Sequence, residues 1–170
     1  MKKILLFFIF ISLNCVAQNH AFKVNPIGFF NKGFEASYEN YIENNCSIEI
    51  VVATAILNRY ESNGQVNILG FEGKYKIYMQ KKDAFKGIYA APVGTLIRTS
   101  ENLSRRYTIL GIGAIAGYQF MLGKPNQKSG FICDINIGAS NYFSSASTNR
   151  NIENIKGFQP RYGASFGYAF

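Results

Sequence analysis

Acidic and basic side chains recur at alternate positions of this chain, and their spacing indicates the chemistry it can offer. Lys74 and Lys76 are two residues apart, and Glu72 lies two residues before Lys74. Residues two apart on a strand share one face, so these groups would gather on a single polar face. If that polar face lines the inside of a barrel, its charged side chains need partners of opposite charge, since an unpaired buried charge is costly. We therefore predict an enclosed charge network of Glu35, Glu49, Glu72, Lys74, Arg98, Asp134 and Arg161.

Residue types suited to catalysis are scarce. The only histidine, His20, lies close to the predicted mature N-terminus, so we expect it in a frayed end rather than beside a nucleophile. Asp134 could form an acid pair with Glu49 or Glu72. Ion pairing is favoured instead, because acidic and basic residues occur on the same face. No His/Cys cluster offers a metal site. We predict no catalytic residue, no cofactor and no metal, and thus a protein that is not an enzyme.

The N-terminal segment has the pattern of a secretory signal. Two lysines precede an unbroken apolar run, Ile4 to Ile11, which is too short to span a bilayer as a helix. Small residues follow at Cys15 and Ala17. We predict a signal peptide at residues 1–17 and one mature domain at 18–170. The alternative is lipid modification of Cys15, for which the preceding Asn14 is a poor fit.

The positive net charge of the chain gives little support for nucleic-acid binding. The formal net charge is +8, but the lysines and arginines are scattered and the protein is predicted to be exported. Lipopolysaccharide phosphates are a more natural partner for a basic exported protein.

Cys46 and Cys133 remain after removal of the signal, and we predict that they do not pair because their strands would lie on opposite sides of a barrel.

The mature chain alternates apolar and polar residues with a period of two, and turn residues interrupt the pattern regularly. Such alternation is typical of strands with two different faces. Most of the predicted strands are long enough to cross a bilayer when tilted. Pro92 is expected to mark a bulge on a polar face. We predict eight strands, at 22–30, 34–41, 47–57, 66–79, 88–98, 107–121, 131–143 and 158–170.

Three features favour a membrane barrel over a soluble one, in which the apolar face would be buried. The polar face carries both charge signs, as expected for the filled interior of an eight-stranded barrel. It also carries small residues that leave room for long side chains: Gly70, Gly94, Gly111, Gly113, Gly117, Gly138, Gly163 and Gly167. Aromatic residues collect near strand ends on the apolar face, as in interfacial girdles: Tyr38, Tyr75, Tyr89, Tyr118, Phe120, Phe131, Phe143, Phe158 and Tyr168.

The C-terminal strand carries a resemblance to known proteins. Tyr162, Phe166, Tyr168 and Phe170 share one face, and the chain stops on an aromatic residue. This resembles the C-terminal signal read by the outer-membrane assembly machinery. The whole mature chain resembles the small OmpA/OmpX-like outer-membrane β-barrel families of unknown function. The resemblance implies an all-β, eight-stranded, antiparallel up-and-down transmembrane β-barrel in the cell outer membrane, and it implies no catalytic or ligand residues.

We expect an integral outer-membrane protein with a structural or surface-binding role. Its partners would be outer-membrane lipid and lipopolysaccharide, together with the assembly machinery, and its contact loops would be Ser144–Gly157 and Thr99–Arg106. Two alternatives remain open. One is a lipid-modifying enzyme on the same scaffold, which needs a nucleophile and a base. The other is a soluble periplasmic barrel that binds an apolar ligand.

Overall fold

The computed structural model describes residues 19–26, 33–42, 45–58, 65–79, 85–101, 105–122, 129–144 and 157–170. The predicted signal peptide at 1–17, with Cys15, lies outside the described residues. Residues 145–156 of the predicted contact loop Ser144–Gly157 lie outside them as well, whereas Ser144 and Gly157 belong to strands.

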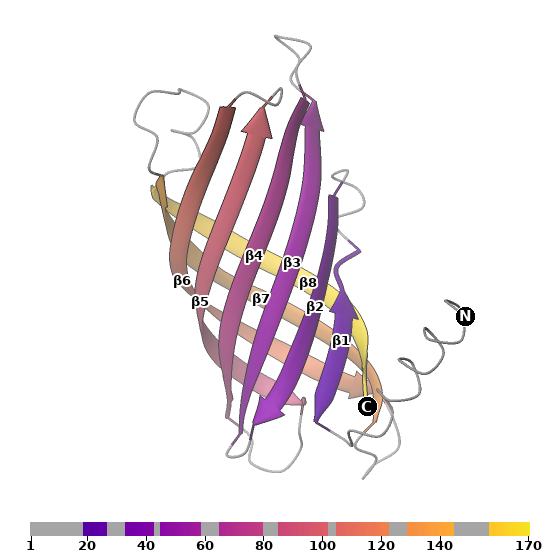
Figure 1. The fold of residues 1–170 in the computed structure, drawn as a ribbon. Helices are drawn as coiled ribbons and strands as arrows, with labels where there is room; N and C mark the ends of the chain where they lie inside the picture. The colour runs from indigo at the N-terminus through magenta and orange to yellow at the C-terminus, as the bar shows by residue number, and fades with distance from the viewer. Residues whose placement is uncertain are drawn as a thin grey trace, which may run out of the picture.

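The described chain forms eight antiparallel strands that close into one barrel (Figure 1). Each strand pairs with its neighbours in sequence, and β1 pairs with β8 to complete the ring. The predicted all-β, eight-stranded, antiparallel barrel is therefore confirmed. The strands are β1 (His20–Val24), β2 (Gly33–Ile42), β3 (Cys46–Asn58), β4 (Gln65–Tyr78), β5 (Gly87–Glu101), β6 (Arg105–Leu122), β7 (Gly130–Ser144) and β8 (Gly157–Ala169).

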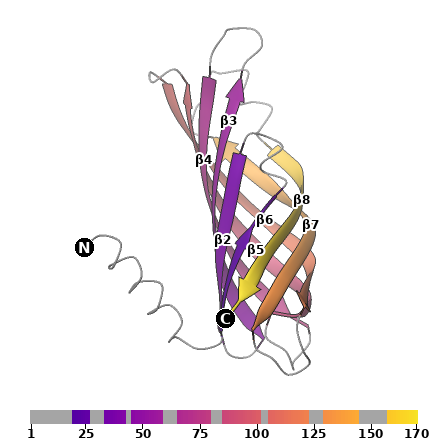
Figure 2. The ribbon, with the colours of Figure 1, turned by 90° about the vertical axis from the view of Figure 1, so that its right-hand side faces the viewer.

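The two described ends of the chain meet at one end of the barrel, which we call the terminal end (Figure 2). The backbone N–H of His20 donates to the carbonyl of Phe170, and the N–H of Phe170 donates back to His20. The prediction that His20 lies in a frayed end was wrong. His20 is the first residue of β1, and its imidazole stacks on the ring of Tyr38.

The first strand is shorter than predicted. It ends at Val24, whereas the alternation suggested an extension to residue 30. Pro26 follows two residues later and has no N–H to donate to the ladder, which accounts for the early end. Residues 27–30 lie outside the described part of the chain. The opposite end of the barrel, toward which β1 runs, is called the distal end.

The barrel wall separates two kinds of side chain. On the inner face Lys23, Glu39 and Lys76 have no exposed surface. On the outer face Ile112 and Ile137 are 64% and 70% exposed. A protein that buries its apolar side chains against a central core has the opposite arrangement. Large apolar side chains exposed on the outer face include Phe22, Ile50, Phe71, Leu96, Leu110, Ile135 and Phe166.

One strand was assigned to the wrong face. The sequence suggested that Tyr89, Ala91 and Val93 point outward, with Arg98 and Gly94 inward. In the structure the first three are buried inside the barrel, and Arg98 and Gly94 lie on the exposed outer face. The reason is that β5 carries apolar residues on both faces, so alternation does not identify the inner one.

The predicted bulge at Pro92 is also absent. Val93 and Ala90 face Lys74 and Ile77 on β4, with the same spacing on both strands. Pro92 lies on the outer face opposite Ala114 of β6 and interrupts the ladder without shifting its register.

Small residues allow close approach between β6 and β7 inside the barrel. A methyl group added at Gly113 would collide with the backbone oxygen of Ala139 and the side chain of Ser140. A methyl group at Gly94, on the outer face of β5, would meet no atom within 4 Å. The first glycine is therefore required by packing, whereas the second is not.

We expect Gly113→Ala to lower the free energy of unfolding by about 1–3 kcal/mol, because the backbone of β7 must move to admit the methyl group. The matched control Gly94→Ala should change it by less than about 0.5 kcal/mol. Chemical denaturation followed by circular dichroism measures both. Equal stability of the two variants would contradict the close packing of β6 on β7.

Candidate functional site

The interior of the barrel is filled in three layers, starting from the terminal end. The terminal plug consists of Ala21, Tyr41, Phe85, Ile132 and Ala169. Above it lies the charge cluster of Lys23, Glu39, Glu49, Lys76 and Asp134. The third layer, the distal cavity, is a space of about 250 Å³ lined by Glu35, Glu72, Lys74 and Arg161, among others.

The terminal plug is closed by Phe85, which lies between β4 and β5. Its side chain is fully buried against Ala21, Ile132 and Ala169 of β1, β7 and β8, across the barrel from β4 and β5. Its ring also contacts that of Tyr41, with centroids 5.7 Å apart. The backbone of Phe85 has φ of 58°, a left-handed conformation that bulky residues rarely adopt. Packing against three strands therefore holds the ring across the terminal end.

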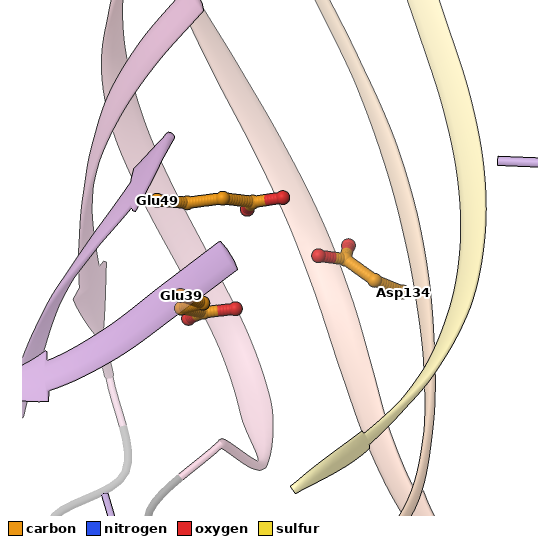
Figure 3. Close-up of side chains that lie close together, drawn as sticks. All are labelled: Glu39, Glu49 and Asp134. Carbon is orange, nitrogen blue, oxygen red and sulfur yellow. The ribbon is translucent and has the colours of Figure 1, made fainter. Parts of the chain in front are cut away.

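The charge cluster is built from three carboxylates and two ammonium groups. Glu39, Glu49 and Asp134 come from β2, β3 and β7 and point toward one another (Figure 3). Lys76 Nζ lies 2.6 Å from Asp134, 2.7 Å from Glu49 and 3.2 Å from Glu39. Lys23 Nζ contacts the same three carboxylates, at 2.6 Å, 3.1 Å and 3.2 Å from Glu39, Glu49 and Asp134. Each ammonium thus joins strands on several sides of the barrel.

Neutral polar side chains complete the cluster. The hydroxyl of Tyr78 donates to Glu39 at 2.6 Å, and that of Tyr89 donates to Asp134 at 2.7 Å. The hydroxyl of Ser47 donates to Glu39, and the side-chain oxygen of Gln119 accepts from Lys76 at 3.0 Å. These hydrogen bonds offset part of the cost of removing five charged groups from water.

The three carboxylates are close enough together to hold a metal ion. The two ammonium groups, however, already lie among the same oxygens. A metal ion would have to displace Lys23 or Lys76, both of which are fully buried. The arrangement is therefore that of an ion-paired structural core.

The distal cavity carries a second set of ion pairs. Arg161 of β8 is paired with Glu72 of β4 and also donates to Thr95 and Ser140, each at 3.2 Å. Lys74 lies 3.5 Å from Glu72 and 3.7 Å from Glu49, which links the cavity to the charge cluster. Inward side chains of β3, β4 and β5 form an aliphatic wall: Val51, Ala53, Ala55, Ile68 and Ile97.

Six of the seven residues predicted as an enclosed charge network lie on the inner face. Arg98 does not, because it lies on the outer face of β5 as described above. The other six fall into two groups: Glu49 and Asp134 in the charge cluster, and Glu35, Glu72, Lys74 and Arg161 around the distal cavity.

Sequence reasoning missed several residues of the interior, among them Lys23, Phe85 and Tyr89. Lys23 was not assigned to the network, although it alternates with the outward Phe22 and Val24 on the same strand. Phe85 lies within the sequence segment Gln80–Gly87, which was predicted as a polar and basic turn, and carries no signal of burial. Tyr89 was predicted in an outer aromatic girdle, but its hydroxyl donates to Asp134 and Lys76 Nζ lies 4.5 Å from the centre of its ring.

Three residues of the predicted assembly signal lie on β8, the last strand, and the fourth, Phe170, follows its end. Tyr162, Phe166 and Tyr168 are 81%, 52% and 45% exposed on the outer face of β8. Phe170 packs its ring 6.2 Å from that of His20. Cys46 and Cys133 lie on β3 and β7, on opposite sides of the ring, and no disulfide joins them, as predicted.

Comparison with protein-family models, with curated proteins and with solved structures found no match. Among the described residues, no helix has the length and apolar character needed to cross a membrane.

Removal of Lys76 tests the charge cluster. We expect Lys76→Met to destabilise the barrel by about 3–5 kcal/mol, because Glu39, Glu49 and Asp134 would then share fewer cations within one buried site. Denaturant titration of the folded barrel measures this loss. The double variant Lys76→Met with Asp134→Asn should regain part of the stability, since it removes one carboxylate. If the double variant lost more folding free energy than the two single variants lose together, the ion-pairing account would be contradicted.

Proposed function

We propose that this chain is an integral β-barrel protein of a bacterial outer membrane with a structural or surface-binding role and no catalytic activity. The observation that carries the proposal is the reversed distribution of side chains. Charged groups are buried in the interior, whereas Ile, Leu, Phe and Tyr cover the outside of the wall. An apolar patch of this extent is rare on a soluble monomer and is the normal surface of a membrane barrel.

The closed ring of strands supports the same proposal. A barrel satisfies the backbone N–H and C=O groups of every strand without free edges, as hydrocarbon surroundings require. Six strands have 13 or more residues, and β6 has 18. A tilted strand needs only about 9–11 residues to cross the hydrocarbon layer. The N-terminal segment with its secretory pattern supplies the route of export.

The proposed partners follow from the two surfaces of the wall. Acyl chains of outer-membrane lipid would contact the apolar outer face. We propose that the assembly machinery reads the outward aromatic residues of β8, Tyr162, Phe166 and Tyr168. Arg98, which lies on the outer face toward the distal end, would meet lipopolysaccharide phosphates. With the terminal plug and the charge cluster filling the interior, the barrel is expected not to conduct.

Membrane fractionation of cells that express the full-length chain tests the location. We expect the protein in the outer-membrane fraction, released only by detergent. Before boiling it should migrate faster in a detergent gel than after boiling, because a closed barrel without free edges resists unfolding. Recovery in the periplasmic wash without detergent would instead indicate a soluble barrel.

A charged residue introduced on the outer face distinguishes a membrane barrel from a soluble one. Ile112 lies near the middle of β6, and Phe158 lies near the distal end of β8. If the outer face meets lipid, Ile112→Lys should cost about 2–4 kcal/mol of folding free energy and Phe158→Lys about 0–1 kcal/mol. Folding yield into vesicles as a function of denaturant measures both. Equal tolerance of the two lysines would argue for water outside the wall.

A further inference from the structure

The distal cavity has features that the membrane location does not explain. Its space of about 250 Å³ is larger than a single ion requires. The aliphatic wall on β3, β4 and β5 faces charged side chains within the same enclosure. Ligand sites commonly combine an apolar wall with a few placed polar groups, whereas a purely structural interior is filled.

The charges that line the distal cavity balance in number, with Glu35 and Glu72 against Lys74 and Arg161, but not in pairing, because both bases contact Glu72. Among the described inner side chains, five are acidic (Glu35, Glu39, Glu49, Glu72 and Asp134) and four are basic (Lys23, Lys74, Lys76 and Arg161). Four of the acids contact at least one of these lysines or arginines. Among these five inner acids, Glu35 is the one for which no described lysine or arginine lies at ion-pair distance.

Glu35 is half-buried and lines the distal cavity. Its described hydrogen-bond partner is the side-chain amide of Asn25, at 3.2 Å. A partly enclosed carboxylate is stabilised when a cation binds beside it, because the lost hydration is replaced by a charge-assisted hydrogen bond. Glu35 is therefore the carboxylate of the cavity at which an added cation would complete an ion pair.

The other groups restrict the kind of cation. An anionic ligand is disfavoured because Lys74 and Arg161 already hold Glu72, and Glu35 would repel it. A bare metal ion needs several converging oxygen atoms, and of the described carboxylates that line the cavity only Glu35 has no lysine or arginine at ion-pair distance. An organic ammonium needs one carboxylate, and its carbon chain can bury against Val51, Ile68 and Ile97.

We propose that the distal cavity binds a small primary aliphatic amine in its protonated form. The ammonium group lies on the Glu35 carboxylate, and the short alkyl chain packs on the aliphatic wall of β3, β4 and β5. This site concerns the inside of the barrel and does not depend on which medium surrounds the wall.

Two glycines provide a matched pair of variants. Gly70 lines the cavity, and a Cβ added there would lie 3.6 Å from the Cβ of Ala53, an ordinary contact. Gly70→Leu therefore places a larger side chain at the cavity wall from a position where its Cβ makes only ordinary contacts. Gly94→Leu makes the same change on the outer face, where a Cβ meets no atom within 4 Å. Glu35→Gln removes the charge and keeps the shape.

The test is calorimetric titration of the purified folded protein with n-butylammonium, n-butyrate, n-butanol and potassium ions. Each variant is first checked for the gel mobility of the folded barrel. We expect n-butylammonium to bind about tenfold or more tightly than the other three, and Glu35→Gln and Gly70→Leu each to weaken that binding about tenfold or more. The Gly94→Leu protein should bind like the unaltered one.

Equal binding of n-butanol or n-butyrate would overturn the proposal, and so would unchanged binding by the Glu35→Gln protein. Displacement of n-butylammonium by an equal concentration of potassium would show a simple ion site instead. If Glu35→Gln does not fold, Gly70→Leu and Gly94→Leu decide the question. Equal binding of n-butylammonium by these two variants would show that the amine does not bind in the distal cavity. These results are independent of membrane fractionation, so failure of this proposal and failure of the proposed location are distinguishable.

Discussion

The fold depends on the ion pairing of Lys23 and Lys76 with three carboxylates in the middle of the barrel. Each ammonium contacts Glu39, Glu49 and Asp134, which come from β2, β3 and β7. An eight-stranded barrel has an interior just wide enough for side chains to fill it, so residues on facing strands meet at its centre. Because a charge buried there is stable only with its partners present, the cluster requires the ring to close in this register.

The same constraint explains the layers on either side of the cluster. Toward the terminal end, Tyr41, Phe85 and Ile132 fill the interior and separate the charges from solvent. Toward the distal end, Lys74 extends the pairing to Glu72, which in turn pairs with Arg161. These three residues line the distal cavity together with the aliphatic wall of β3, β4 and β5. A rigid, ion-paired floor with an open space above it is a scaffold suited to holding a small polar ligand in place.

The outer face of the barrel is apolar where the interior is charged. With polar groups satisfied inside, the wall can present apolar side chains outward along almost its whole height. That arrangement lowers the free energy of the barrel only if the outer face is removed from water. The placement of charge in the interior thus supports the proposed membrane location, and the exposed aromatic residues of β8 belong to the same outer surface.

The sequence by itself determined the class of fold, the number of strands and most of their limits, because a period of two marks strands locally and turn residues mark their ends. It also identified Glu49, Glu72, Lys74, Asp134 and Arg161 as inner residues, since charged side chains alternate with apolar ones on those strands. Only the tertiary structure decided the inner face of β5, where both faces carry apolar residues and alternation cannot distinguish them. It also decided the burial of Phe85 and Lys23, because the partners that bury them lie on strands far away in the chain.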